Sequence, residues 1–84
     1  MPDATHVRED LAAVIRLIVD RPEDVEIEEV WTDDRSCIFE LRVEDDDLGK
    51  VIGRQGRTAR SLRALLETRG LHEGVEYGLE ILDD

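Results

Sequence analysis

The spacing of the apolar residues changes along the chain, and this succession constrains the fold more than any other feature of the sequence. Apolar residues first follow helical spacing, which predicts a helix over residues 7–19 that ends before the proline at position 22. They then alternate with polar residues over 25–31 and 37–43, which predicts two strands joined as an antiparallel hairpin by the polar turn at 32–36. The first half of the chain therefore reads helix, strand, strand.

The second half returns to helical spacing around a pair of glycines. A short helix is predicted over 48–52 and a long helix over 57–68, and Gly53-Arg54-Gln55-Gly56 separates them. A glycine-bracketed loop over 70–74 leads into a last alternating strand over 75–81. The predicted order is α-β-β-α-α-β, an α+β arrangement.

On the predicted long helix, apolar and basic side chains separate onto different sides. At about 100° per residue, the predicted core side holds Ala59, Leu62, Leu65 and Leu66. The other side holds Arg57, Arg60 and Arg63. The arginines are therefore expected to be displayed together, next to the glycine pair.

Length and composition restrict the chain to one small domain. Its 84 residues suit a single domain over 1–84, with a core at about 7–82 and a frayed N-terminus over 1–6. The single cysteine permits neither an internal disulfide nor a cysteine zinc cluster, and no apolar run is long enough to cross a membrane. The first residues lack the basic and apolar regions of a signal peptide. We therefore expect a cytoplasmic protein with no membrane partner.

The charged residues are distributed unevenly. The chain carries a formal net charge of −11, which argues against a general affinity for polyanions. None of its 22 acidic residues falls between Leu48 and Leu66, however, and this stretch contains Lys50, Arg54, Arg57, Arg60 and Arg63. Such clustering concentrates positive potential in one place. It favours a local anionic ligand over the simpler interpretation of a solvated helix face.

The glycine pair gives this basic stretch a backbone suited to phosphate. Two glycines separated by two residues let the chain turn tightly and keep side chains out of the way of a ligand. The amides of Gly56 and Arg57 open the long helix, where N–H groups without internal partners favour anions. A glycine pair alone is a weak signal, and the helical context, the basic side chains and the apolar frame strengthen it.

The segment Val51-Ile52-Gly53-Arg54-Gln55-Gly56-Arg57-Thr58-Ala59-Arg60-Ser61-Leu62-Arg63 resembles the signature of the KH domain. The residues over 19–27 and the element order extend the resemblance, over roughly 11–82, to the small bacterial single-KH proteins of the KhpA family. The resemblance implies a type II KH fold, in which helices pack on one face of a three-stranded mixed sheet. It further implies a non-enzymatic protein that binds single-stranded RNA as a chaperone or post-transcriptional regulator. The implied protein partner is a second copy or a larger KH protein of the KhpB type.

The resemblance also assigns binding roles to residues of the basic stretch. The clamp on the RNA backbone, over about four nucleotides, corresponds to Gly53, Arg54, Gln55 and Gly56. The flanking helices contribute Lys50, Val51 and Ile52 before the loop and Arg57, Ala59, Arg60 and Arg63 after it. The strand at 37–43 is expected to form the far wall of the groove.

Two other functions fit parts of the pattern. A nucleotide-hydrolysing enzyme is disfavoured, because Gly56-Arg57-Thr58 lacks the lysine of a Walker loop and follows a helix instead of a strand. A small acidic interaction module would use the arginine face of the helix at 57–68 to grip an acidic protein, and it stays as the alternative. RNA that stays bound through purification would distinguish it from an RNA-binding protein.

The remaining reactive residues predict no catalytic, metal or cofactor site. His6 and His72 lack partners in the sequence, and Cys37 has the alternation of a buried, inert thiol. The acidic run at 44–47 lacks the glycine and the distal glutamate of a calcium loop, so we expect it to cap the following helix. Trp31, on an otherwise acidic strand, is expected to mark a dimer contact.

Overall fold

The computed structural model describes residues 2–83. Within this range the helices and strands occur in the predicted order: α1 (Thr5–Ile18), β1 (Glu26–Asp33), β2 (Ser36–Arg42), α2 (Leu48–Ile52), α3 (Arg57–Glu73) and β3 (Glu76–Ile81). Short 3-10 turns occupy three of the connections, at Pro22–Asp24, Asp45–Asp47 and Arg54–Gly56.

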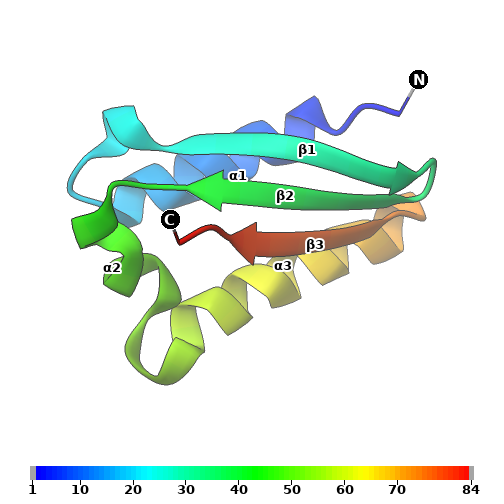
Figure 1. Ribbon diagram of the computed structural model, residues 1–84. Helices are drawn as coiled ribbons and strands as arrows, with labels where there is room; N and C mark the ends of the chain where they lie inside the picture. The colour runs from blue at the N-terminus through cyan, green and yellow to red at the C-terminus, as the bar shows by residue number, and fades with distance from the viewer. Residues whose placement is uncertain (1, 84) are drawn as a thin grey trace.

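β2 is the central strand of a three-stranded sheet with the order β1-β2-β3. It pairs antiparallel with β1 and parallel with β3. The helices lie on one side of this sheet, with α1 crossing behind β1 and β2 and α3 packing against β3 (Figure 1). The predicted α+β fold, with helices on one face of a mixed sheet, is confirmed.

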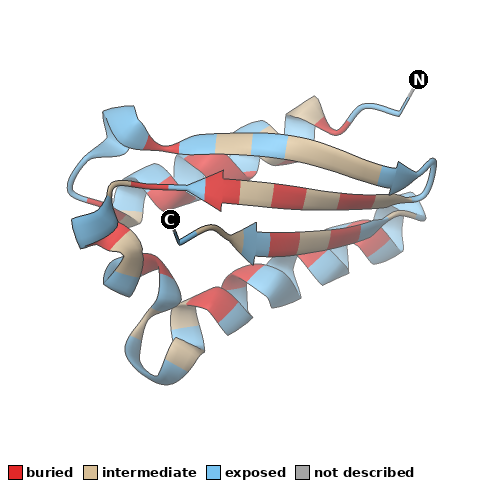
Figure 2. Cartoon of the chain, viewed as in Figure 1, coloured by how far each residue is buried: buried red, intermediate tan, exposed pale blue. Residues whose placement is uncertain are grey.

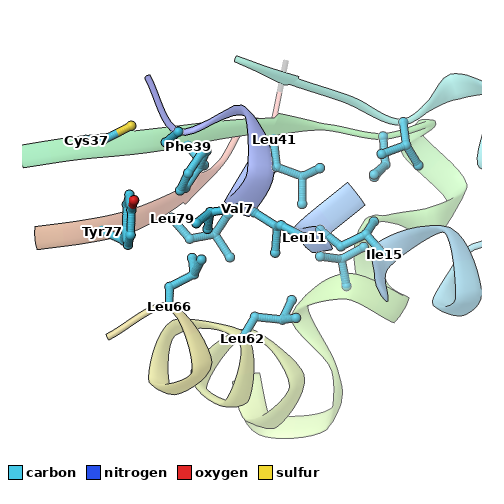
Figure 3. Close-up of a cluster of buried hydrophobic side chains, with 14 of the residues drawn as sticks. Val7, Leu11, Ile15, Cys37, Phe39, Leu41, Leu62, Leu66, Tyr77 and Leu79 are labelled. Carbon is cyan, nitrogen blue, oxygen red and sulfur yellow. The ribbon is translucent and has the colours of Figure 1, made fainter. Parts of the chain in front are cut away.

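The core lies between the sheet and the helices. Along β2, buried residues alternate with less buried ones, as the sequence pattern predicts (Figure 2). Figure 3 shows side chains of both long helices converging on the sheet, and the core includes Leu11, Ile15, Cys37, Phe39, Leu41, Leu62, Leu66 and Leu79. Helix α2 adds the fully buried Val51, which ties it to this core.

The N-terminal segment is more ordered than the sequence predicts. Helix α1 begins at Thr5, and the preceding Ala4 is fully buried. Glu29 on β1 holds this end, because its carboxylate accepts hydrogen bonds from the Ala4 N–H at 2.9 Å and from Arg8 Nε at 3.1 Å. The same carboxylate accepts the indole N–H of Trp31 at 3.1 Å. The expected fraying is therefore wrong for residues 4–6, and Met1 lies outside the described residues.

Helix α3 also continues beyond its predicted end, and a glycine explains why. Gly70, placed in a loop by the sequence, is a buried helical residue, and a Cβ on it would lie 2.2 Å from the carbonyl oxygen of Val75. The small residue thus allows β3 to start close against the helix. The left-handed Gly74 ends α3. The prediction that Leu65 faces the core is wrong, because that side chain is 62% exposed.

The sheet face that no helix covers is acidic. Glu28, Glu40 and Glu80 are direct neighbours across the three strands, and all three alternate with residues that face the helices. Like charges placed opposite one another on a sheet are destabilising. The row therefore places three carboxylates side by side on this face, which also carries Arg42.

Candidate functional site

The loop between α2 and α3 has a backbone that glycine makes possible. Gly53 and Gly56 have φ angles of 77° and 73°, and Gln55 between them is also left-handed, with a φ of 58°. A Cβ on Gly53 would lie 2.3 Å from Thr58 Oγ1 and 2.8 Å from the Thr58 backbone nitrogen. Gly53 is therefore required both for its conformation and for the close approach of α3.

The amides of Gly56 and Arg57 do not form the anion site that the sequence predicts. The Gly56 N–H donates to the Gly53 carbonyl at 3.1 Å, and the Arg57 N–H donates to the Arg54 carbonyl. Both bonds belong to the 3-10 turn that the loop adopts before α3 begins. The Gly56 and Arg57 amides are therefore not available to a ligand.

Arginine side chains surround the loop, and two of them are unpaired. Arg54 and Arg60 are exposed, and neither has an ion-pair or hydrogen-bond partner among residues 2–83. The exposed Arg57 donates from Nη2 to Gln55 Oε1 at 3.3 Å, which links two predicted contact residues. Unpaired guanidinium groups on an acidic protein are available to bind an anion.

Lys50 differs from the arginines, because acidic residues neutralise its charge. Its Nζ lies 3.0 Å from Asp20 Oδ2 and 3.6 Å from Asp47 Oδ1. The hydrogen bond from Lys50 to Asp20, with the charge of that carboxylate, raises the pKa of Lys50 above its usual value. The structure thus places this predicted contact residue near the loop but in an internal network.

Asp47 is the centre of that network, and sequence reasoning missed its role. The residue is buried, and its carboxylate accepts the backbone N–H groups of Asp20 and Arg21, each at 3.1 Å. The Asp20 N–H is the main cause that lowers the pKa of Asp47. The expected cap by the acidic run is made by Glu44, whose carboxylate accepts the Asp46 N–H at 2.8 Å at the start of the 3-10 turn before α2, and Asp47 itself makes no side-chain cap bond to α2. The carboxylate of Asp47 instead joins the segment that follows α1 to the start of α2.

Arg63 is fixed to the sheet, so it does not belong to a free arginine face. Its Nε and Nη2 donate to the Leu79 carbonyl of β3 at 3.3 and 3.2 Å. No pattern in the sequence indicates that a backbone carbonyl of the last strand accepts hydrogen bonds from Arg63.

The network of Lys50 had a weak signal in the sequence, because an acidic residue, Asp47, lies three positions before it.

A shallow hollow lies beside the loop, and β3 forms its sheet side. The helical side contributes Ile52, Gly56, Ala59, Arg60 and Arg63, and the strand contributes Leu79, Glu80 and Ile81. The expectation that residues 37–43 form the far wall is wrong, because β3 occupies the sheet edge between β2 and α3. Val51 is fully buried and lines no part of this hollow. The site therefore combines unpaired cations, an apolar floor and one carboxylate.

The other residues considered from the sequence lie outside this site. Cys37 is buried, and burial raises the pKa of its thiol to about 11, as expected for an inert thiol. His6 pairs with Glu73 at 3.0 Å. Within residues 2–83, no three His, Cys, Asp or Glu side chains are grouped as metal ligands. None of the helices in this range is long and apolar enough to cross a membrane.

Comparisons with known proteins give consistent matches over nearly the whole chain. A sequence model described as the KhpA/KhpB KH domain matches residues 8–81. The RNA-binding protein KhpA of Chlamydia caviae is 41% identical over 78 residues, which cover 93% of this chain and 99% of the relative. The RNA-binding protein KhpA of Treponema pallidum is 40% identical over 79 residues, covering 94% and 98%. The protein of the same name from Clostridium perfringens is 37% identical over 76 residues, covering 90% and 100%.

Proposed function

The chain belongs to the KhpA/KhpB KH-domain family, and we propose that it binds single-stranded RNA at the loop over 53–56 and the hollow beside it. The observation that carries this proposal is the pair of unpaired, exposed arginines, Arg54 within the glycine-shaped turn and Arg60 in the first turns of α3. The relatives named above are called RNA-binding proteins, and this supports the same ligand class for this chain.

The arrangement suggests how the RNA strand would lie. Arg54, Gln55 and Arg57 supply exposed donors at the loop, and these suit phosphate oxygens. The apolar floor made by Ala59 and Leu79 suits unstacked bases, which a paired helix would not offer. Such a clamp covers about four nucleotides in KH domains. Val51 supports α2 from the core, and Lys50 acts through its network with Asp47.

The proposed activity is binding without chemical turnover, as an RNA chaperone or post-transcriptional regulator in the cytoplasm. The groups that could perform catalysis do not converge on the hollow. Cys37 is buried in the core, and His6 is paired with Glu73 at the far end of α3. The hollow holds one carboxylate and two guanidinium groups, and these suit recognition of an anionic strand more than bond cleavage.

The test of the clamp is the double variant Arg54→Asp with Gln55→Asp, measured by fluorescence anisotropy with labelled RNA. Two carboxylates at the loop would repel phosphate, so binding should be lost while circular dichroism stays normal. Arg35→Asp with His72→Asp is the matched control, because both residues are exposed and belong to the β1–β2 turn and to the last turn of α3, segments that lie at the opposite end of the molecule from the loop (Figure 1). Unchanged RNA affinity in the folded loop variant would refute the assignment of the clamp.

The alternative of an acidic interaction module is not favoured by the comparisons, because the relatives are named for RNA binding. The structure also fixes Arg63 to Leu79, and this weakens the idea of a continuous arginine face on α3. Protein purified without nuclease treatment should carry RNA, seen as ultraviolet absorbance of nucleic acid. Loss of that absorbance in the variant Arg54→Asp with Gln55→Asp would show that the co-purified RNA is bound at this site.

We also propose that the chain pairs with a second copy of itself through the outer surface of α1 and α3, and not through Trp31, which packs against the core of its own chain. The groove between these helices is lined by apolar side chains, among them Val14 and Leu65, which are 39% and 62% exposed. Its charged residues are one acid, Asp10, and one base, Arg69. Arg69 lies 3.8 Å from Glu73 of its own chain, and in the proposed two-fold pair Asp10 of the other copy is the acid that the groove offers it in addition. This balanced groove contrasts with a net charge of −11, which makes most contacts between copies repulsive.

The pairing surface can be tested by sedimentation equilibrium. Leu65→Glu should convert a dimer to a monomer, because it places a charge in an apolar contact. Leu71→Glu is the control, since Leu71 is on the same helix and is 81% exposed, but lies outside the groove. A wild-type chain that is monomeric alone would contradict self-pairing and would favour a larger KH protein of the KhpB type as the occupant.

A further inference from the structure

β1 is an edge strand, and its outer side has no neighbour in the fold. The sheet order is β1-β2-β3, and Figure 1 shows no helix or strand alongside β1 on the side away from β2. Within residues 2–83, no residue outside β2 forms a hydrogen bond to the backbone of β1. An edge strand directs every second pair of N–H and C=O groups outward. These groups of β1 are therefore available to pair with an extended chain.

The two halves of β1 differ along this edge. Glu29, in the middle of the strand, points toward the helices, where its carboxylate accepts hydrogen bonds from Ala4 and Arg8. An inward-pointing charge of this kind discourages the pairing of a further strand. The residues before it, over 25–28, border instead a hollow between β1 and α1. The first half of β1 is therefore the open part of the edge.

The helix side of this hollow is partly apolar and nearly balanced in charge. Ala12 of α1 and Ile27 of β1 supply its apolar surface, and Ile27 alternates with residues of the uncovered sheet face. The charged residues on α1 are one arginine that is already paired with β1 and two residues of opposite sign, namely Arg8, Glu9 and Arg16. This side of the edge therefore suits small apolar side chains.

The other side of the same edge, on the uncovered sheet face, is acidic. Glu26 and Glu28 are exposed there, and neither has an ion-pair partner among residues 2–83. Arg42 lies opposite Glu26. Glu28 begins the row of carboxylates that continues through Glu40 to Glu80. A basic side chain on an added strand would lie beside Glu28, and opposite charges on neighbouring strands stabilise a sheet.

We propose that the open edge over 25–28 binds an extended segment of a protein partner as an added strand, and that basic and small apolar residues alternate in this segment. Successive side chains of a strand point to opposite faces, so the basic ones meet Glu28 and the apolar ones meet Ile27 and Ala12. In this mode of recognition, backbone hydrogen bonds supply affinity and alternating side chains supply specificity. The surface shares no residue with the hollow beside the loop over 53–56, so the inference does not rest on the proposed RNA binding.

The probe is a labelled peptide of about eight residues, the length of an ordinary strand, in which lysine and valine alternate. Fluorescence anisotropy on the full chain measures its affinity. A second peptide has the same sequence but carries a methyl group on every backbone nitrogen, so it keeps the charges and lacks the donors that a strand needs. It should bind about tenfold more weakly or worse.

Glu28→Lys tests the role of the carboxylate. It should weaken binding of the lysine peptide about fivefold, and strengthen binding of a peptide in which glutamate replaces lysine. Glu76→Lys is the matched control, because Glu76 is exposed on the same sheet face but lies on β3, at the opposite edge. It makes the same change of charge, so its smaller loss measures long-range attraction alone. A wild type that does not bind the lysine peptide, equal binding of the methylated peptide, or equal losses in the two variants would overturn the inference.

Discussion

Helix α2 has five residues, and its two ends are built in opposite ways. At the N-terminal end, the buried carboxylate of Asp47 accepts two backbone N–H groups and lies 3.6 Å from Lys50 Nζ. At the C-terminal end, the loop leaves the exposed Arg54 without a partner among the described residues. The two ends of this short helix therefore have different roles: one is structural, and the other presents a charge. Internal bonds fix one end, and this holds the other end in place while its charge stays available to a ligand.

The largest effect is expected where the loop meets α3. Gly53→Ala would place a Cβ 2.3 Å from Thr58 Oγ1 at a φ of +77°, so both a clash and backbone strain oppose it. We expect the free energy of unfolding in urea to fall by about 2–4 kcal/mol. Gly49→Ala in α2 is the control, because its Cβ meets nothing within 4 Å. That variant should gain about 0.5–1 kcal/mol, and equal stabilities would contradict the role of Gly53.

The second prediction concerns the hydrogen bonds of Asp47 at the N-terminal end of α2. Asp47→Asn keeps the shape of the side chain but turns an amide N–H group toward the donors of Asp20 or Arg21. We expect the midpoint of thermal unfolding to fall by about 5 °C or more. Asp46→Asn, on the neighbouring exposed residue, should unfold like the wild type.

The same carboxylate predicts a pH dependence. The hydrogen bond from the Asp20 N–H holds the pKa of Asp47 below its ordinary value of about 3.9. Its stabilising contribution is therefore complete above the unfolded-state pKa and is lost as the pH falls through the folded-state pKa. Thermal unfolding should show a steeper loss of stability below about pH 4 for the wild type than for Asp47→Asn. Parallel curves would show that Asp47 is not the titrating group.

The fourth prediction compares the two ends of α2 through the salt dependence of RNA binding. If Arg54 contacts a phosphate, Arg54→Gln should weaken binding of every RNA. It should also reduce the slope of log binding constant against log salt concentration (the salt slope) by roughly 0.7. Lys50→Gln should change the slope less, because Lys50 is already paired with Asp20 and Asp47. Salt titrations of RNA binding measure both. Equal losses in the two variants would show that the internal network does not restrain Lys50.

The smallest effect is expected at Arg63, and it should be on stability more than on binding. Arg63→Gln removes the two hydrogen bonds to the Leu79 carbonyl and should cost about 0.5–1 kcal/mol. Its effect on the salt slope should be smaller than that of Arg60→Gln, since Arg60 has no partner among residues 2–83. A large loss of slope in Arg63→Gln with unchanged stability would reverse this assignment.

The sequence predicted the fold well, because the fold depends on patterns that repeat over many residues. Alternation along β2 and helical spacing in α1 were sufficient for the element order, and the orientation of Cys37, Phe39 and Leu41 followed from period two. The ends of helices were less predictable. Gly70 reads as a loop residue by composition, yet it is helical because β3 passes too close for a side chain.

For the candidate site, the sequence predicted which residues lie near the loop better than it predicted which of their polar groups are already hydrogen-bonded or ion-paired. The unpaired state of Arg54 agrees with the displayed cation that the basic stretch predicts. The predicted amide site was wrong because the loop closes into a 3-10 turn and uses those N–H groups itself. The pairing of Asp47 with Asp20, and of Arg63 with Leu79, joins residues far apart in the chain. Local patterns cannot show such contacts.

The carboxylate of Glu29 has a practical consequence for spectroscopy. It accepts the indole N–H of Trp31, the single tryptophan of the chain, and also holds the start of α1 through Ala4 and Arg8. The indole of Trp31 therefore lies at the contact between α1 and β1, away from the loop over 53–56. The tryptophan emission should change when the first helix detaches during unfolding. It should not change when a nucleic acid binds in the hollow. An extrinsic dye is needed to follow the ligand.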